Sequence, residues 1–166
     1  MLQKFWATEW DNLDRRQQQQ VLDLAPKIDM FRDLPSGTKD LCLLENRRPI
    51  AAIVYHIRGR VLDIRAVTSS TSKNFFERHR KTPADFLILK VLRENKLKVH
   101  YLATGNETSS AGRKFRDRLI KDGIIRTTLS NILLGNGKYR VLYPKPANKH
   151  PSSGKIPNFL AIRRRR

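Results

Sequence analysis

The chain has 166 residues, with 34 Lys and Arg against 15 Asp and Glu, and its net charge is +19. This length suits one domain, and the charge exceeds the magnitude of about 2 to 8 that keeps a small domain soluble. A bound polyanion, nucleic acid above all, is the simplest partner to offset the excess. A single cysteine excludes a disulfide framework, and no apolar run is long enough for a membrane span.

The cysteine and histidine pattern indicates the chemistry to expect. Cys42 lies in the apolar run Leu41–Leu44, which predicts a buried thiol rather than a nucleophile. One reduced cysteine fits a cytoplasmic protein, and the first ten residues lack the pattern of a signal peptide. The four histidines show no metal-ligand spacing, so we expect no metal.

The positive charge is distributed unevenly along the chain. Residues 1–40 carry six bases and seven acids, a net charge of −1, so the remaining residues carry +20. We predict that nucleic acid binds a surface formed by Arg47, Arg48, Arg58, Arg60, Lys73, Arg163, Arg164, Arg165 and Arg166. The alternative is a uniformly solvated cationic surface. Phe75 and Phe76 lie among these bases and either stack on unpaired bases or belong to the core.

The pattern of residues 13–67 predicts helices followed by an antiparallel meander. Apolar residues from Leu13 to Phe31 recur at helical spacing, broken near Pro26. Strands are predicted at 41–45, 50–56 and 61–67, joined by short turns. Glu77 and His79 are predicted to lie in a charged loop after the third strand.

A helix is predicted from Thr82 to about Asn95, because threonine caps helices and Pro83 suits the first helical position. A strand at 98–104 follows, then a helix from Ser109 or Ser110 to a left-handed cap at Gly123. Ile124 and Ile125 begin a last strand region, with a hairpin turn at Asn136 and Gly137. Residues 144–166 contain four of the eight prolines, seven bases and no acid, which predicts a disordered basic tail behind a domain at 1–143.

This α+β order of elements resembles the GNAT superfamily of N-acyltransferases over residues 10–143. The most specific piece runs from Tyr101 to Ile125, a strand followed by Asn106 and a helix that closes in Lys-Asp-Gly-Ile. The resemblance implies a mixed sheet and an acetyl-CoA cofactor, whose pyrophosphate binds a helix N-terminus. The cofactor-binding residues that it implies are Val67, Thr68, Arg78, Arg80, Lys81, Thr82, Ala84 and Asn106.

The sequence departs from the family pattern at two points. Lys81 and Pro83 stand where the family has phosphate-binding glycines, and Pro83 removes an amide donor. Leu119 occupies the position of the family's general-acid tyrosine. Tyr101 and Tyr143 are the substitute candidates for that catalytic role, which the sequence otherwise leaves unknown.

Three functions stay open at the level of sequence. The first is a divergent acyltransferase that acts on or in contact with nucleic acid. The second is a catalytically inactive protein of the same fold that binds DNA or RNA. The third is a component of a ribonucleoprotein.

Overall fold

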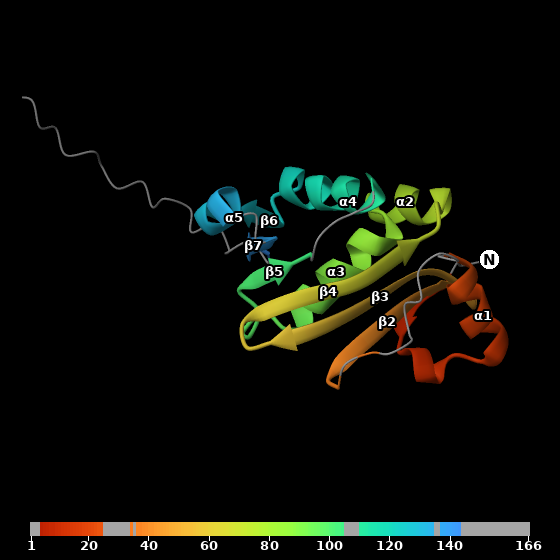
Figure 1. Ribbon diagram of the computed structural model, residues 1–166. Helices are drawn as coiled ribbons and strands as arrows, with labels where there is room; N and C mark the ends of the chain where they lie inside the picture. The colour runs from red at the N-terminus through yellow and green to blue at the C-terminus, as the bar shows by residue number, and fades with distance from the viewer. Residues whose placement is uncertain (1–3, 25–33, 35, 105–109, 135–136, 144–166) are drawn as a thin grey trace, which may run out of the picture.

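The computed structural model describes residues 4–24, 34, 36–104, 110–134 and 137–143. Figure 1 shows its helices and strands. In chain order they are β1 (Phe5–Thr8), the 3₁₀ helix η1 (Trp10–Asn12), α1 (Arg15–Leu24), β2 (Thr38–Glu45), β3 (Arg48–Arg58), β4 (Val61–Ser69), α2 (Lys73–His79), α3 (Pro83–Glu94), β5 (Tyr101–Ala103), α4 (Ser110–Lys121), β6 (Ile125–Thr127), α5 (Leu129–Leu134) and β7 (Lys138–Val141).

The strands form one seven-stranded mixed sheet in the order β1-β2-β3-β4-β5-β7-β6. The four strands from β1 to β4 pair antiparallel, and two tight hairpins join β2, β3 and β4. β4 and β5 pair in parallel, with α2 and α3 in the connection between them. The predicted α+β fold and the antiparallel meander are therefore confirmed.

The larger apolar cluster lies between the sheet and helices α2, α3 and α4. α3 presents Leu87, Ile88 and Val91 to Ile53 and Leu62 of the strands, and all five side chains are buried. α4 adds Phe115 and Leu119 at helical spacing to the same cluster. This cluster joins α3 and α4 on one face of the sheet (Figure 1).

The opposite face carries a smaller cluster beneath α1. Val21 of α1 and Leu13 pack on Cys42, Ala52 and Val54. Burial raises the pKa of the Cys42 thiol to about 12, so the thiolate does not form near neutral pH. Cys42 is therefore a packing residue, as its apolar neighbours in the sequence predicted.

β4 separates from β5 after three residue pairs, the last of which is Asp63 with Ala103. β4 continues to Ser69, while β5 ends at Ala103. Arg65 is the extra residue of a β-bulge, because Val54 pairs with Ala66 and Tyr55 with Ile64. The bulge lies where the two strands part, and the edge of β4, which pairs with no described strand there, borders the space that opens.

Four elements differ from their prediction. The segment around Glu77 and His79 is the helix α2 rather than a loop, because Ser72 caps it and Phe75 is anchored in the core. Leu129–Leu134 form α5 where a continuous strand region was expected, and β1 was not foreseen. β5 is also shorter than predicted. Asn136 and the tail at 144–166 lie outside the described residues.

Within the described ranges, no helix has both the length and the apolar character needed to cross a bilayer.

Candidate functional site

A cleft of about 780 Å³ opens where β4 leaves β5. Its floor is the second half of β4 and the segment that follows, from Ile64 to Lys73. Its other walls are the first turn of α3, Thr104 at the end of β5, and the face of α4 from Ala111 to Arg118. The bulge and the shortness of β5 thus create the cleft, and α3 points its N-terminus at it.

The α3 N-terminus offers fewer amide donors than a helix start usually does. Pro83 has no amide hydrogen, the Asp85 amide donates to Thr82 Oγ1 at 3.2 Å, and the Phe86 amide donates to the Thr82 carbonyl. The amide of Ala84 remains for a ligand. An anion bound in the cleft would therefore depend on side-chain cations more than on the helix end.

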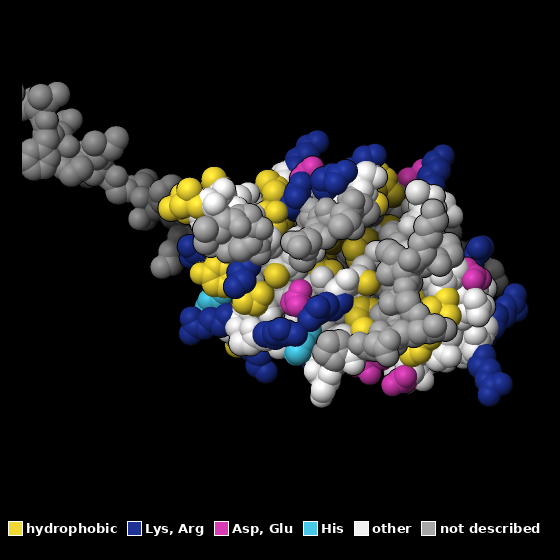
Figure 2. Space-filling view, in the orientation of Figure 1, with side chains coloured by type: hydrophobic (Ala, Val, Ile, Leu, Met, Phe, Trp, Pro, Cys, Tyr) yellow, Lys and Arg dark blue, Asp and Glu magenta, His cyan; other side chains and the backbone are white. Residues whose placement is uncertain are grey.

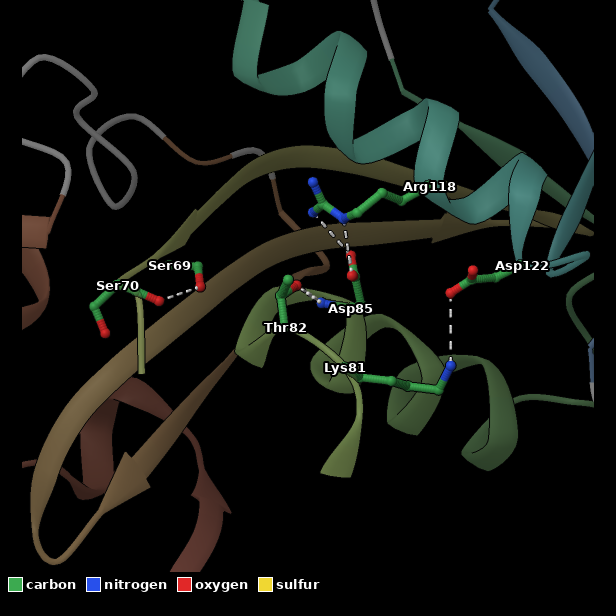
Figure 3. Close-up of polar contacts among 7 residues, drawn as sticks. All are labelled: Ser69, Ser70, Lys81, Thr82, Asp85, Arg118 and Asp122. Carbon is green, nitrogen blue, oxygen red and sulfur yellow. Dashed lines mark hydrogen bonds and ion pairs between the residues drawn. The ribbon is translucent and has the colours of Figure 1, made fainter. Parts of the chain in front are cut away.

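Arg118 of α4 spans the cleft wall and reaches the first turn of α3 (Figure 3). Its Nε and Nη2 atoms donate to the two carboxylate oxygens of Asp85 at 3.0 and 3.1 Å. Asp85 is 3% exposed, so this bidentate pair compensates a buried charge. The pair also offsets the negative charge that Asp85 would otherwise present to an anion at the helix end.

Four cationic side chains line the cleft: Arg65, Lys73, Lys114 and Arg118. Two of them come from α4, which carries five bases and one acid, Asp117. No cofactor contact was predicted on this helix from the sequence. The density of bases between Arg113 and Lys121 was a visible signal, but only the fold brings that segment opposite β4.

Hydroxyl groups supply further polar contacts along the cleft. Thr68, Thr82 and Thr104 line it, together with a run of Ser and Thr from Ser69 to Ser72. Thr104 Oγ1 is buried and has no hydrogen-bond partner among the described residues. An unsatisfied buried hydroxyl at the wall of a cleft marks a position where a ligand atom would complete a hydrogen bond.

The residues predicted to bind the cofactor divide into three groups. Val67, Thr68, Thr82 and Ala84 line the cleft, whereas Arg78, Arg80 and Lys81 do not. Arg78 lies over the Phe5 ring, and Arg80 ends α2 in the left-handed conformation. Asn106 lies outside the described residues.

A second hollow of about 600 Å³ lies beside α3, away from the cleft. Lys81 lines it and pairs with Asp122 at 3.7 Å, as Figure 3 shows. Tyr143, one of the two catalytic candidates, also lines it, and its hydroxyl accepts a hydrogen bond from Arg93 at 2.9 Å. The other candidate, Tyr101, is 39% exposed on β5 and lines neither space.

The described residues that line the cleft include no Asp, Glu, His, Cys or Tyr. Proton transfer near neutral pH is most often carried by such side chains. The described part of the cleft therefore offers cationic and hydroxyl groups to an anion, but no carboxylate, imidazole, thiol or phenol to act as a general acid or base. The same part of the chain contains no group of three or more His, Cys, Asp or Glu side chains that could hold a metal ion.

The predicted nucleic-acid residues lie at two ends of the sheet. Arg47 lies in the turn before β3, and Arg48 begins the strand. Arg58 ends β3, and Arg60 lies in the turn that follows it. Ten residue steps separate Arg48 from Arg58, which is about 33 Å along an extended strand. Lys73 lines the cleft, and Arg163 to Arg166 lie outside the described residues. Of these bases, the described ones at the two ends of β3 do not form one patch.

Comparison with known proteins gives a likeness in structure but none in sequence. No protein-family model matches the chain, and no curated protein matches it. YhhK of E. coli, which is named as an N-acetyltransferase and was solved by NMR with coenzyme A bound, superposes with a TM-score of 0.56 at 13% identity. That match covers 83% of this chain and 98% of YhhK.

Two further structures are similar at a lower level. An acetyltransferase of Bacillus subtilis in complex with CoA matches at 14% identity with a TM-score of 0.49, over 75% of this chain and 78% of its own. An acetyltransferase of Elizabethkingia anophelis with acetyl-CoA bound has the same identity and TM-score, over 84% and 92%. At these identities the comparisons establish the fold, and the argument for it rests on YhhK together with the strand order.

Proposed function

We propose that this chain, which has the GNAT fold of N-acyltransferases, binds an acyl-CoA in the cleft between β4 and α4 and transfers the acyl group on or in contact with nucleic acid. The observation that carries the proposal is the cleft itself. It opens at the parting of two parallel strands, in front of a helix N-terminus, and four cations line it.

The described residues fit a ligand with an elongated polar arm and a phosphate end. Among the described residues, β4 beyond Asp63 has no partner strand on the β5 side, so its backbone can hydrogen-bond the amides of a pantetheine arm as an added strand would. Thr104 Oγ1 offers another polar contact. Lys73, Lys114 and Arg118 would bind the phosphates, together with the amide of Ala84.

Acyl-CoA, when bound, supplies an activated thioester, and the chain must place an acceptor nitrogen beside it. Preorganised backbone and hydroxyl donors along β4 would orient the carbonyl and exclude water. The described wall holds no carboxylate, imidazole or phenol to act as a general base, so an amine acceptor would have to arrive uncharged or lose its proton to another group. The net charge of +19 supports an acceptor that is nucleic acid or is bound to it.

Ligand binding is tested by thermal unfolding with millimolar acetyl-CoA. A ligand at a hundred times its Kd stabilises by about 2.7 kcal/mol, so the melting temperature should rise. Lys114→Ala should weaken acetyl-CoA binding about three- to thirtyfold through loss of one charged contact. Lys121→Ala is the matched control, because it removes the same charge from the same helix outside the cleft. An unchanged melting temperature in the unmodified protein would refute the cofactor proposal.

Transfer is tested with radiolabelled acetyl-CoA and mixed tRNA, single-stranded DNA and duplex DNA as acceptors. Label in the nucleic-acid fraction is the expected result, and Lys114→Ala should reduce it when acetyl-CoA is kept below its Kd. The described cleft wall lacks a carboxylate, imidazole, thiol or phenol. This lack favours a second candidate, an inactive protein of this fold that binds nucleic acid. Oligonucleotide binding without any response to acetyl-CoA would select that second candidate.

A further inference from the structure

A row of side chains crosses five strands on the face of the sheet that lies away from α3. Arg58 pairs with Val61, Val61 with Tyr101, Tyr101 with Arg140, and Arg140 with Arg126. Directly paired residues project to the same face, and four strand spacings span roughly 19 Å. We name Arg58, Tyr101, Arg140 and Arg126 the arginine-tyrosine row.

The register fixes which face the row occupies. Leu102 follows Tyr101 on β5, and Tyr139 precedes Arg140 on β7. Both side chains are buried in the cluster under α3. Side chains alternate along a strand, so the row points to the other side. Tyr101 is 39% exposed there, and the three arginines are exposed as well.

The row carries positive charge without acidic compensation of its own. Arg126 and Arg140 are direct cross-strand partners, an arrangement that repels, and neither makes an ion pair among the described residues. In the neighbouring row, Asp63 pairs with Arg65 at 3.2 Å, and Lys138 adds another base beside Ala103. Figure 2 shows that Lys and Arg side chains predominate over acidic ones where β4, β5 and β7 lie.

We infer that the arginine-tyrosine row binds a single strand of nucleic acid, with Tyr101 stacking on one base and Arg58, Arg126 and Arg140 contacting the backbone. A polyanion removes the repulsion between the paired arginines. An exposed ring between guanidinium groups suits an unpaired base, because a duplex keeps the faces of its bases stacked. Small neighbours, Val61 and Ala103, leave the ring accessible.

The row leads towards the cleft, and this part of the inference rests on the proposed function. Asp63 and Ala103 are the next pair of β4 and β5 on this face, two residues beyond Val61 and Tyr101. Ile64 and Thr104, one residue further along the two strands, both line the cleft. A strand held on the row would therefore pass the mouth of the cleft, where an acyl group would be transferred.

The test is fluorescence anisotropy of the full chain with a labelled 12-nucleotide RNA, the DNA of the same sequence, and the corresponding duplex. Both single strands should bind more tightly than the duplex, and the difference between RNA and DNA reports whether the 2′-hydroxyl contributes. Tyr101→Ala should weaken single-strand binding by at least about fivefold, and Tyr101→Trp should retain it. Tighter binding of the duplex, or no effect of Tyr101→Ala, would overturn the inference.

Charge is tested with two double variants of equal net charge. R126E/R140E should weaken binding by about tenfold or more and reduce the slope of log K against log salt by about 1.4. R47E/R48E changes the charge by the same amount about 33 Å from Arg58, at the other end of β3, and should weaken binding much less. Equal losses in both would mean that net charge alone governs binding and would refute the site.

The same variants separate this inference from the proposed function. R126E/R140E should keep the acetyl-CoA response of the melting temperature, because neither residue lines the cleft. A retained response with unchanged oligonucleotide affinity would reject the row and leave the cofactor proposal standing. Loss of oligonucleotide affinity in a protein that never responds to acetyl-CoA would reject the cofactor proposal and leave the row.

Discussion

The two faces of the sheet differ in polarity, although adjacent residues of the same strands contribute to both faces. Towards α3 the strands present Leu62, Leu102 and Tyr139, all buried in one apolar cluster. On the other face, the described residues pack in the smaller apolar cluster under α1, and the β5-β7-β6 end presents Tyr101 and Arg140. Apolar packing, and the stability that it provides, is thus concentrated on one face, so the other face can carry charge. The cleft opens where β4 and β5 part.

The largest effect should come from the α3 face. Leu62 is fully buried at the centre of the sheet, so Leu62→Ala should lower the free energy of unfolding by about 2–5 kcal/mol through lost transfer energy and a cavity. Urea unfolding followed by circular dichroism measures the change. Val61→Ala, the neighbour on the other face, is the control and should cost less, because Val61 is only partly buried. Equal costs would contradict the asymmetry of the two faces.

The next effect concerns the ion pair between α3 and α4. Arg118→Met leaves the buried Asp85 carboxylate without its bidentate partner, and we expect a loss of about 1–3 kcal/mol, limited by the 41% exposure of Arg118. Lys81→Met breaks the ion pair between Lys81, just before α3, and Asp122, just after α4. These two side chains are 34% and 42% exposed, so the loss should be less than about 1 kcal/mol. Urea midpoints compare the two, and a larger loss in Lys81→Met would refute the structural role of Arg118.

The sequence predicted most of the elements whose signals are local. Thr82 and Pro83 marked the start of α3, Gly123 adopts the predicted positive φ, and the turns of the meander followed from short polar segments. β1 was missed because an edge strand of four residues is defined by its pairing with β2.

The site was less predictable because it is assembled from distant segments. The contact between Asp85 and Arg118 joins residues 33 positions apart, and nothing near Asp85 in the sequence indicates it. Bases next to the helix start, such as Lys81, were natural candidates for phosphate binding. The turn of the chain there directs Lys81 to Asp122 instead. The arginine-tyrosine row likewise depends on a cross-strand register that only the assembled sheet defines.

A smaller effect should come from the face under α1. Val21→Ala removes two carbon atoms from the small cluster and should cost about 1–2 kcal/mol. Alkylation of Cys42 is the second readout, because this buried thiol contacts the same cluster and its raised pKa keeps it unreactive in the folded protein. Val21→Ala should accelerate labelling at pH 8. If Leu62→Ala accelerated labelling without any effect of Val21→Ala, α1 would not be the element that protects this face.

The smallest effect concerns the turn of the β2–β3 hairpin, which joins β2 and β3. Asn46 and Arg47 form its two-residue turn with φ of 49° and 69°. Asparagine tolerates this conformation, whereas arginine is strained in it, and glycine is the preferred second residue of such turns. Arg47→Gly should therefore raise the free energy of unfolding by a few tenths to about 1 kcal/mol, since greater freedom of glycine in the unfolded chain offsets part of the gain. Arg47→Ala removes the same charge but keeps the strained backbone, so its midpoint in urea should not rise. A gain of equal size in both variants would mean that relief of charge repulsion, rather than of backbone strain, limits the stability of this end of the sheet.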